Sequence, residues 1–102
     1  MAAAMLSITS VKAVKGIVEV KRTTREVKKY RMVNRRQQDR VLIIEHPNRT
    51  NQQFKLVETE KPIEDTKDVY RFQVALKAGE EKSFVVTEER ETESTTTLSR
   101  PA

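Results

Sequence analysis

The chain has 102 residues, of which 36% are apolar and 34% are charged, and its formal net charge is +5. This length suits a single domain with one hydrophobic core. Because the chain has no cysteine and one histidine, it excludes disulfides, thiolate nucleophiles, cysteine-ligated metals and any site that needs two imidazoles. No apolar run approaches the ~20 residues of a membrane helix, so we expect no membrane insertion by this chain.

The first ten residues mix alanine, methionine and leucine with small polar residues, and we expect residues 1–10 to be a flexible N-terminal segment. A second methionine, Met5, suggests residues placed ahead of an excised domain, so we interpret the chain as a fragment of a longer protein. Next, Val11 and Val14 precede the pair Lys15-Gly16, and residues 17–20, which are apolar except for Glu19, follow it. This spacing predicts a β-hairpin that turns at Lys15-Gly16.

The middle of the chain contains three further strand segments. Residues 27–33 are rich in β-forming side chains and end at Asn34, which favours a turn. Residues 41–44 are apolar at every position, which is typical of a central strand, and Pro47 ends this strand because proline cannot donate to the ladder. Residues 54–57 predict a short strand.

The C-terminal part contains the clearest alternation. Over residues 70–77, large apolar side chains occupy every second position and alternate with Arg71, Gln73, Ala75 and Lys77, which predicts a half-buried strand. Gly79 supplies a turn position, and residues 82–87 are again rich in β-branched and aromatic side chains, so the two runs predict an antiparallel hairpin. Residues 90–102 hold one leucine and no aromatic residue, and we expect them to be a disordered polar tail.

These six or seven strand segments, with no helical periodicity sustained over three turns, predict an all-β fold. The expected architecture is an antiparallel β-sandwich of the immunoglobulin-like type over residues 11–89, with a small barrel as the alternative. The parity of each strand assigns the expected core, which consists of Val20, Tyr30, Leu42, Ile44, Leu56, Tyr70, Phe72, Val74, Leu76, Phe84 and Val86.

Several short motifs occur in an order that carries a family resemblance. They are YRMVN at 30–34, IIEHP at 43–47, YRFQV at 70–74 and AGE at 78–80. Together they resemble the C-terminal domain of bacterial mucoidy-inhibitor-A-like proteins over residues 17–90. The resemblance implies a β-sandwich of unknown function that follows a coiled-coil segment in a longer chain. It brings no catalytic residue and no cofactor.

Candidate catalytic and metal-ligating groups are few. His46 follows Glu45, but adjacent strand residues point to opposite faces, so this pair cannot chelate one metal, and we expect the imidazole to be hydrogen-bonded to a loop. Glu64, Asp65 and Asp68 cluster before a strand, but they lack the spacing and the glycine of a calcium loop, so we interpret them as a solvated loop. We therefore expect no catalytic residue, no metal and no cofactor.

Residues 21–40 hold nine basic and two acidic side chains, and this basic segment is the strongest chemical feature of the sequence. In one regular strand, its first half would divide between two faces. Arg35, Arg36 and Arg40 lie in the loop that follows and form a candidate basic patch. Such a patch can follow a phosphate backbone, but single-strand binding also needs exposed aromatic side chains, and only Tyr30 is at hand.

From these observations we hypothesise a non-catalytic module of a larger bacterial protein, with a structural or protein-interaction role, rather than an enzyme. The expected partners are other domains of the parent chain, or a protein that pairs with an exposed strand edge. The alternative is a small basic nucleic-acid-binding domain, although nucleic acid is the less favoured partner. Salt-dependent binding to DNA or RNA separates the two hypotheses.

Overall fold

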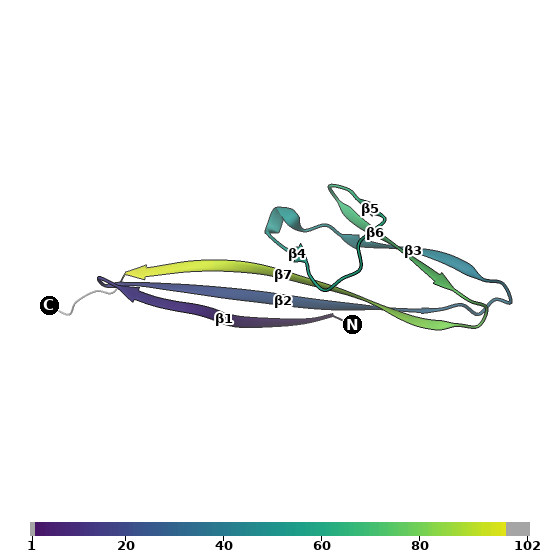
Figure 1. Ribbon diagram of the computed structural model, residues 1–102, viewed down its shortest axis with the longest axis horizontal. Coiled ribbons are helices and arrows are strands. Elements are labelled where there is room, and N and C mark those ends of the chain that lie inside the picture. The colour runs from purple at the N-terminus through teal and green to yellow at the C-terminus, as the bar shows by residue number, and fades with distance from the viewer. Residues whose placement is uncertain (1, 98–102) are drawn as a thin grey trace.

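The computed structural model describes the backbone of residues 2–97 and the side chains of residues 4–95. The described chain is all-β, as the sequence predicts, with seven strands in two antiparallel sheets and no α-helix (Figure 1). A single turn of 3₁₀-helix follows the third strand at Thr50–Gln52. The strands are β1 (Ala2–Val14), β2 (Ile17–Val33), β3 (Arg40–Pro47), β4 (Lys55–Leu56), β5 (Glu64–Asp65), β6 (Val69–Leu76) and β7 (Glu81–Thr97).

The first sheet has the order β1-β2-β7-β4. Its hairpin turn at Lys15-Gly16 is confirmed, since Val14 pairs with Ile17 across a two-residue loop. Both loop residues have positive φ, 50° for Lys15 and 78° for Gly16, as the hairpin turns that match strand twist require. Gly16 adopts its φ of 78° without steric cost, because glycine has no Cβ atom.

The two ends of the described chain differ from the sequence-based expectation. Residues 2–10 lie in β1 rather than in a flexible segment, and residues 90–97 lie in β7 rather than in a disordered tail. The physical reason is β2, whose 17 residues offer ladder hydrogen bonds on both edges, to β1 and to β7. The amino-acid composition of a segment indicates how much apolar surface it can bury, but it does not show whether a partner strand is available. Residues 98–102 of the expected tail lie outside the described residues.

The second sheet has the order β3-β6-β5, and it corrects two predictions. Residues 41–44 do not form a central strand, because β3 is an edge strand that pairs with β6 alone, and its side chains Val41, Leu42 and Ile43 are exposed. The predicted hairpin between residues 70–77 and 82–87 is also wrong. A turn closed by the Glu80 amide, which donates to the Lys77 carbonyl at 2.9 Å, carries the chain from β6 into the other sheet, where β7 pairs with β2.

The hydrophobic core combines side chains from both sheets. Its buried members are Met32, Ile44, Tyr70, Phe72, Val74, Leu76 and Val86, with Tyr30, Leu56 and Phe84 packed against them. Most of the predicted core is therefore confirmed. Two assignments are corrected: Leu42 is 38% exposed near the open end of β3, and Val20 is only half-buried in a part of the sheet without a second layer. Met32 and Phe54 are not in the predicted core, but both are buried.

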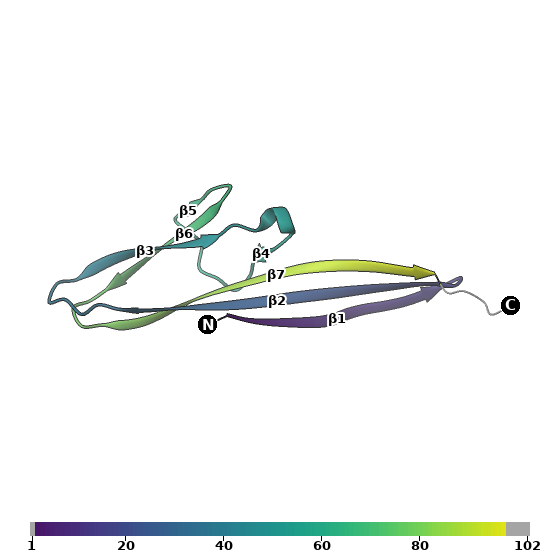
Figure 2. The same ribbon diagram turned by 180° about the vertical axis from the view of Figure 1, so that it is seen from behind.

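The molecule is elongated, with extents of 76 × 24 × 17 Å. The second sheet, β4 and the 3₁₀ turn lie over one part of the long β2–β7 ribbon, and the remaining part of the first sheet projects beyond them (Figures 1 and 2). We call this projecting part the extension. It consists of residues 6–14 of β1, 17–24 of β2 and 90–97 of β7, which pair with one another.

Candidate functional site

A buried polar network lies between the two sheets. His46 on β3 and Glu88 on β7 are both almost fully buried, and the His46 Nε2 atom lies 2.6 Å from Glu88 Oε1. The other ring nitrogen, Nδ1, lies 2.7 Å from the Tyr30 hydroxyl on β2. The expected hydrogen bond from His46 to a loop is thus replaced by bonds to two other strands. The imidazole joins three long strands at one point.

Arg49, just after β3, completes this network. One guanidinium nitrogen donates to Glu88 at 3.0 Å and to Glu26 on β2 at 2.5 Å, while the guanidinium lies 4.1 Å from the Phe54 ring centroid. Burial lowers the pKa of Arg49, but the hydrogen bonds to Glu26 and Glu88 outweigh it and leave the pKa raised. The arginine therefore stays charged, and it forms an ion pair with each of the two carboxylates, Glu26 and Glu88.

Tyr70 also lies close to this network. Burial raises the pKa of its hydroxyl, and the charges of Asp65 and Glu88 add to this effect.

A hollow beside β1 opens onto the network. It is lined by Ala4, Glu26, Val27, Lys28, His46, Arg49 and Glu88. That lining has a base and two carboxylates but no hydroxyl or thiol that His46 could activate as a nucleophile. What the described geometry shows is that the network ties β2, β3 and β7 together between the two sheets.

The carboxylates near β5 do not converge on a site. Glu64 pairs with Arg71 at 3.0 Å, and this hydrogen bond raises the pKa of Arg71. Asp65 accepts a hydrogen bond from Asn48 at 3.1 Å, and all three acidic residues predicted as a solvated loop are exposed, Asp68 included. Within the part of the chain that the structure describes, no group of three His, Cys, Asp or Glu side chains could hold a metal ion.

The three arginines of the candidate basic patch do come together. Arg35, Arg36 and Arg40 line one hollow, together with Asn34 and the apolar side chains Val33, Val41, Leu42 and Leu76. Asn34 fixes this loop, because its Nδ2 donates to the Gln38 carbonyl at 2.8 Å and its Oδ1 accepts from the Arg36 amide at 3.1 Å. The remainder of the basic segment is partly neutralised, for example Arg31 by Glu81.

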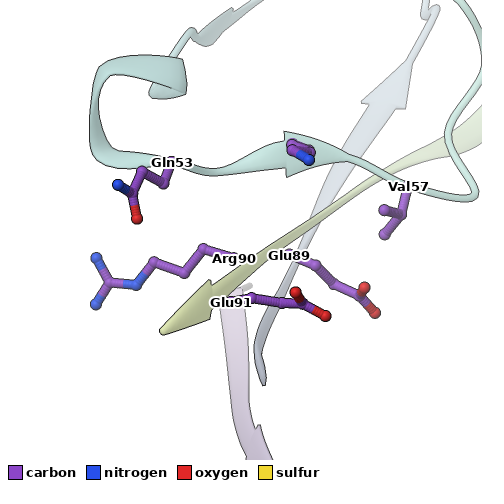
Figure 3. Close-up of a pocket in the computed structure, with 6 residues that line it drawn as sticks. Gln53, Val57, Glu89, Arg90 and Glu91 are labelled. Atoms are coloured by element: carbon purple, nitrogen blue, oxygen red, sulfur yellow. The ribbon is translucent and has the colours of Figure 1, made fainter. Parts of the chain in front are cut away.

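A further hollow lies where β4 ends and the outer edge of β7 loses its partner strand. Its labelled lining residues are Gln53, Val57, Glu89, Arg90 and Glu91 (Figure 3). Arg90 extends from β7 toward Gln53, whereas Glu89 and Glu91 extend the other way. Glu89 is also paired with Arg25 at 2.8 Å, and this hydrogen bond raises the pKa of Arg25. The basic side chain of Arg90 and the acidic side chains of Glu89 and Glu91 thus lie on different sides of this hollow, and they do not form a cluster of like charge.

The most exposed apolar side chains of the extension lie on one face of its sheet. In β2, even-numbered residues share the face on which Tyr30 and Met32 meet the core. Through the register of β1, Leu6 and Ile8 lie on that same face. Thr9 is an extra residue in β1, since Ile8 pairs with Arg22 and Ser10 with Lys21. This bulge shifts the parity and brings Val11, opposite Val20, onto the same face.

We call this face of the extension the inner face. Leu6, Ile8 and Val11 are 63%, 62% and 63% exposed there, because no described element covers them. The opposite face carries charged cross-strand neighbours, such as Lys21 opposite Glu93 and Lys12 opposite Glu19. The two faces of the extension therefore differ. The outer face is mostly polar, apart from Val14 and Ile17 beside the hairpin turn, whereas the inner face exposes its apolar side chains along β1. This apolar face is not evident from the sequence, since the bulge at Thr9 interrupts the alternation along β1.

Comparison with known proteins identifies no family for this chain. The chain matches none of the protein-family models, curated proteins or solved structures with which it was compared. No helix within residues 2–97 is long and apolar enough to cross a membrane. The case for a function therefore depends on the geometry of the chain itself.

Proposed function

We propose that the chain is a non-catalytic module that binds a protein through the inner face of the extension. The observation that carries this proposal is the set of three large apolar side chains, Leu6, Ile8 and Val11, that lie more than 60% exposed on one side of a two-sided sheet. Exposed apolar patches on folded domains mark interaction surfaces. Fully burying one such side chain stabilises a complex by about 1.5–3 kcal/mol.

The proposal includes the finer architecture and family expected from the sequence. The two sheets form an immunoglobulin-like β-sandwich, which the shared core supports, since the Phe72 and Phe84 rings lie 4.9 Å apart across the two sheets. The module is the C-terminal domain of a longer bacterial protein similar to the mucoidy-inhibitor-A-like family, in which other domains or a protein partner contact it. A structural role for the His46 network, rather than a catalytic one, agrees with this proposal.

The first test removes the apolar character of the inner face while keeping the strand. In the double variant Ile8→Thr with Val11→Thr, threonine retains a high β-propensity, so we expect the fluorescence of a bound apolar dye to fall several-fold with little change in the denaturant midpoint. Val14→Thr is the matched control, because Val14 is exposed on the opposite face of the same strand. Equal dye binding by wild type and the double variant would contradict the proposed function.

The alternative function, a small basic nucleic-acid-binding domain, is favoured by one observation. Arg35, Arg36 and Arg40 line one hollow, and no ion pair involves them in the described structure. The hollow contains no aromatic side chain on which a base could stack. Binding of a nucleic acid here would therefore depend on electrostatic attraction to its phosphates, and this attraction weakens steeply as the salt concentration rises.

We accordingly expect only weak, nonspecific binding of mixed-sequence DNA and RNA, with dissociation constants of ~10⁻⁴–10⁻⁶ M near physiological salt. A fluorescence titration at two salt concentrations measures this binding. The double variant Arg35→Ala with Arg36→Ala is compared with Lys61→Ala, an exposed cation elsewhere on the surface. Binding well below a micromolar that only the arginine variant weakens would favour the nucleic-acid function over the interaction module.

A further inference from the structure

We infer that a second copy of this chain covers the inner face of the extension, in a two-fold symmetric dimer in which β1 of one protomer runs antiparallel over β1 of the other. This inference rests on the proposed function, because it names the partner of the same surface. Three features of the extension support it: the continuity of its face with the core, the match of side chains in this arrangement and the position of its charges. The area of the face then sets the expected strength.

The inner face continues a surface that is already covered by a sheet. On β2 and β7, the side chains of Tyr30 and Phe84 face the second sheet and pack against the core that it shares. The same face continues into the extension, where the second sheet is absent (Figures 1 and 2). Aligned sheets pack about 10 Å apart through interdigitating side chains. A layer that covers the extension therefore needs a sheet face with apolar side chains, and the inner face of a second protomer is such a face with the same length.

A two-fold axis that crosses the strands between Ile8 and Val11 gives a complementary set of contacts. It places Val11 of one protomer over Ile8 of the other, and Ala13 over Leu6. Large side chains thus meet smaller ones, as interdigitation requires. It also stacks the polar strand β7, with Thr92 and Ser94, over its own copy.

The opposite choice of axis, along the strands, would place β1 over β7. Leu6, Ile8 and Val11 would then lie over Arg90, Thr92 and Ser94, and their apolar surface would lack apolar partners. Direct pairing of the two β1 edges is a third arrangement. The bulge at Thr9 opposes it, because bulges on edge strands disturb the ladder and turn the edge away from a new partner.

Charges on the inner face permit the antiparallel arrangement. Arg22 is the charged side chain nearest its centre, and its guanidinium donates to the Ser94 hydroxyl at 3.3 Å, which directs the charge toward β7 and away from β1. With the axis between Ile8 and Val11, Arg22 of one protomer lies over Val20 of the other. The two Arg22 side chains are therefore one row apart rather than opposite each other.

The area of the face sets the expected strength of the dimer. Three strands spaced ~4.8 Å apart and four side-chain rows spaced ~6.6 Å apart give a footprint of roughly 350–400 Å² per protomer. This is about half of the ~800 Å² per partner that a standard interface buries. We therefore expect a reversible dimer with a dissociation constant in the range of about ten micromolar to one millimolar.

Sedimentation velocity over a concentration series from micromolar to millimolar tests this inference. The wild-type chain is expected to shift from monomer to dimer across the series, Ile8→Thr with Val11→Thr to remain monomeric, and the outer-face control Val14→Thr to behave as wild type. A wild-type chain that stays monomeric throughout would overturn the second copy as occupant. If the dye experiment still meets expectation, the inner face remains a binding surface for another protein, so the two failures are distinguishable.

Cross-linking tests the arrangement, and the absence of native cysteine makes it selective. An equimolar mixture of Ile8→Cys and Val11→Cys proteins is treated with a short thiol-to-thiol cross-linker at a concentration where the dimer forms. The mixture is expected to give several-fold more covalent dimer than Val14→Cys alone, whose thiol lies on the opposite face. Equal or greater cross-linking of Val14→Cys would overturn the proposed arrangement.

Discussion

Replacing Phe72 by alanine is expected to lower the free energy of unfolding by ~3–5 kcal/mol. Phe72 is 1% exposed at the centre of β6, and its ring lies 4.9 Å from the Phe84 ring and 6.4 Å from the Tyr70 ring. Its removal leaves a cavity between the two sheets, and a closely packed core closes such a cavity only in part. Urea denaturation followed by circular dichroism measures the change.

The matched control is Gln73→Ala, which alters the next residue of the same strand on its exposed face. We expect this variant to stay within about 0.5 kcal/mol of wild type. Because small domains have only ~5–15 kcal/mol of stability, Phe72→Ala can leave the chain unfolded, and Phe72→Leu then provides the milder comparison. A loss under about 1 kcal/mol for Phe72→Ala would show that the register of β6 is wrong.

The sequence predicts strand positions well wherever a period of two is unbroken. In β6, Tyr70, Phe72, Val74 and Leu76 are buried as their alternation requires. The turn at Lys15-Gly16 is equally local, since a two-residue loop with a glycine has a strong conformational preference. In both cases the deciding interactions lie within a few residues along the chain.

Strand partners are not local, and here the predictions fail. Residues 82–87 have the composition of a strand whether they pair with β6 or with β2, and the choice of β2 follows from ladder hydrogen bonds along all 17 residues of β7. The same long ladder turns the apparently unstructured residues 90–97 into strand. The bulge at Thr9 is a further non-local effect, since only the register with β2 reveals it.

The candidate sites divide in the same way. Arg35, Arg36 and Arg40 are close in sequence, and the structure places them around one hollow. The buried network is not evident from the sequence, because Glu88 lies 42 residues after His46 and 39 residues after Arg49. One signal was available. Glu88 shares the parity of Phe84 and Val86, so a charged residue stands at a core-facing position, and such a residue requires a partner.

Replacing Glu88 by alanine is expected to have the second large effect, a loss of ~3–5 kcal/mol in the free energy of unfolding. Glu88 is 2% exposed, and its Oε1 atom accepts from His46 and from Arg49. Its removal leaves the buried imidazole without a partner on one nitrogen and leaves the Arg49 guanidinium with Glu26 alone. Urea denaturation of the variant, in the same buffer as wild type, measures the loss.

The adjacent residue provides the control for Glu88. Glu89 forms an ion pair with Arg25 at 2.8 Å on the other face of β7, but its side chain is 31% exposed, so Glu89→Ala is expected to cost less than about 1 kcal/mol. Glu88→Gln keeps the shape and one acceptor and is expected to fall between the two. Equal losses for Glu88→Ala and Glu89→Ala would contradict a structural role for the buried network, since burial is the main physical difference between these neighbouring carboxylates.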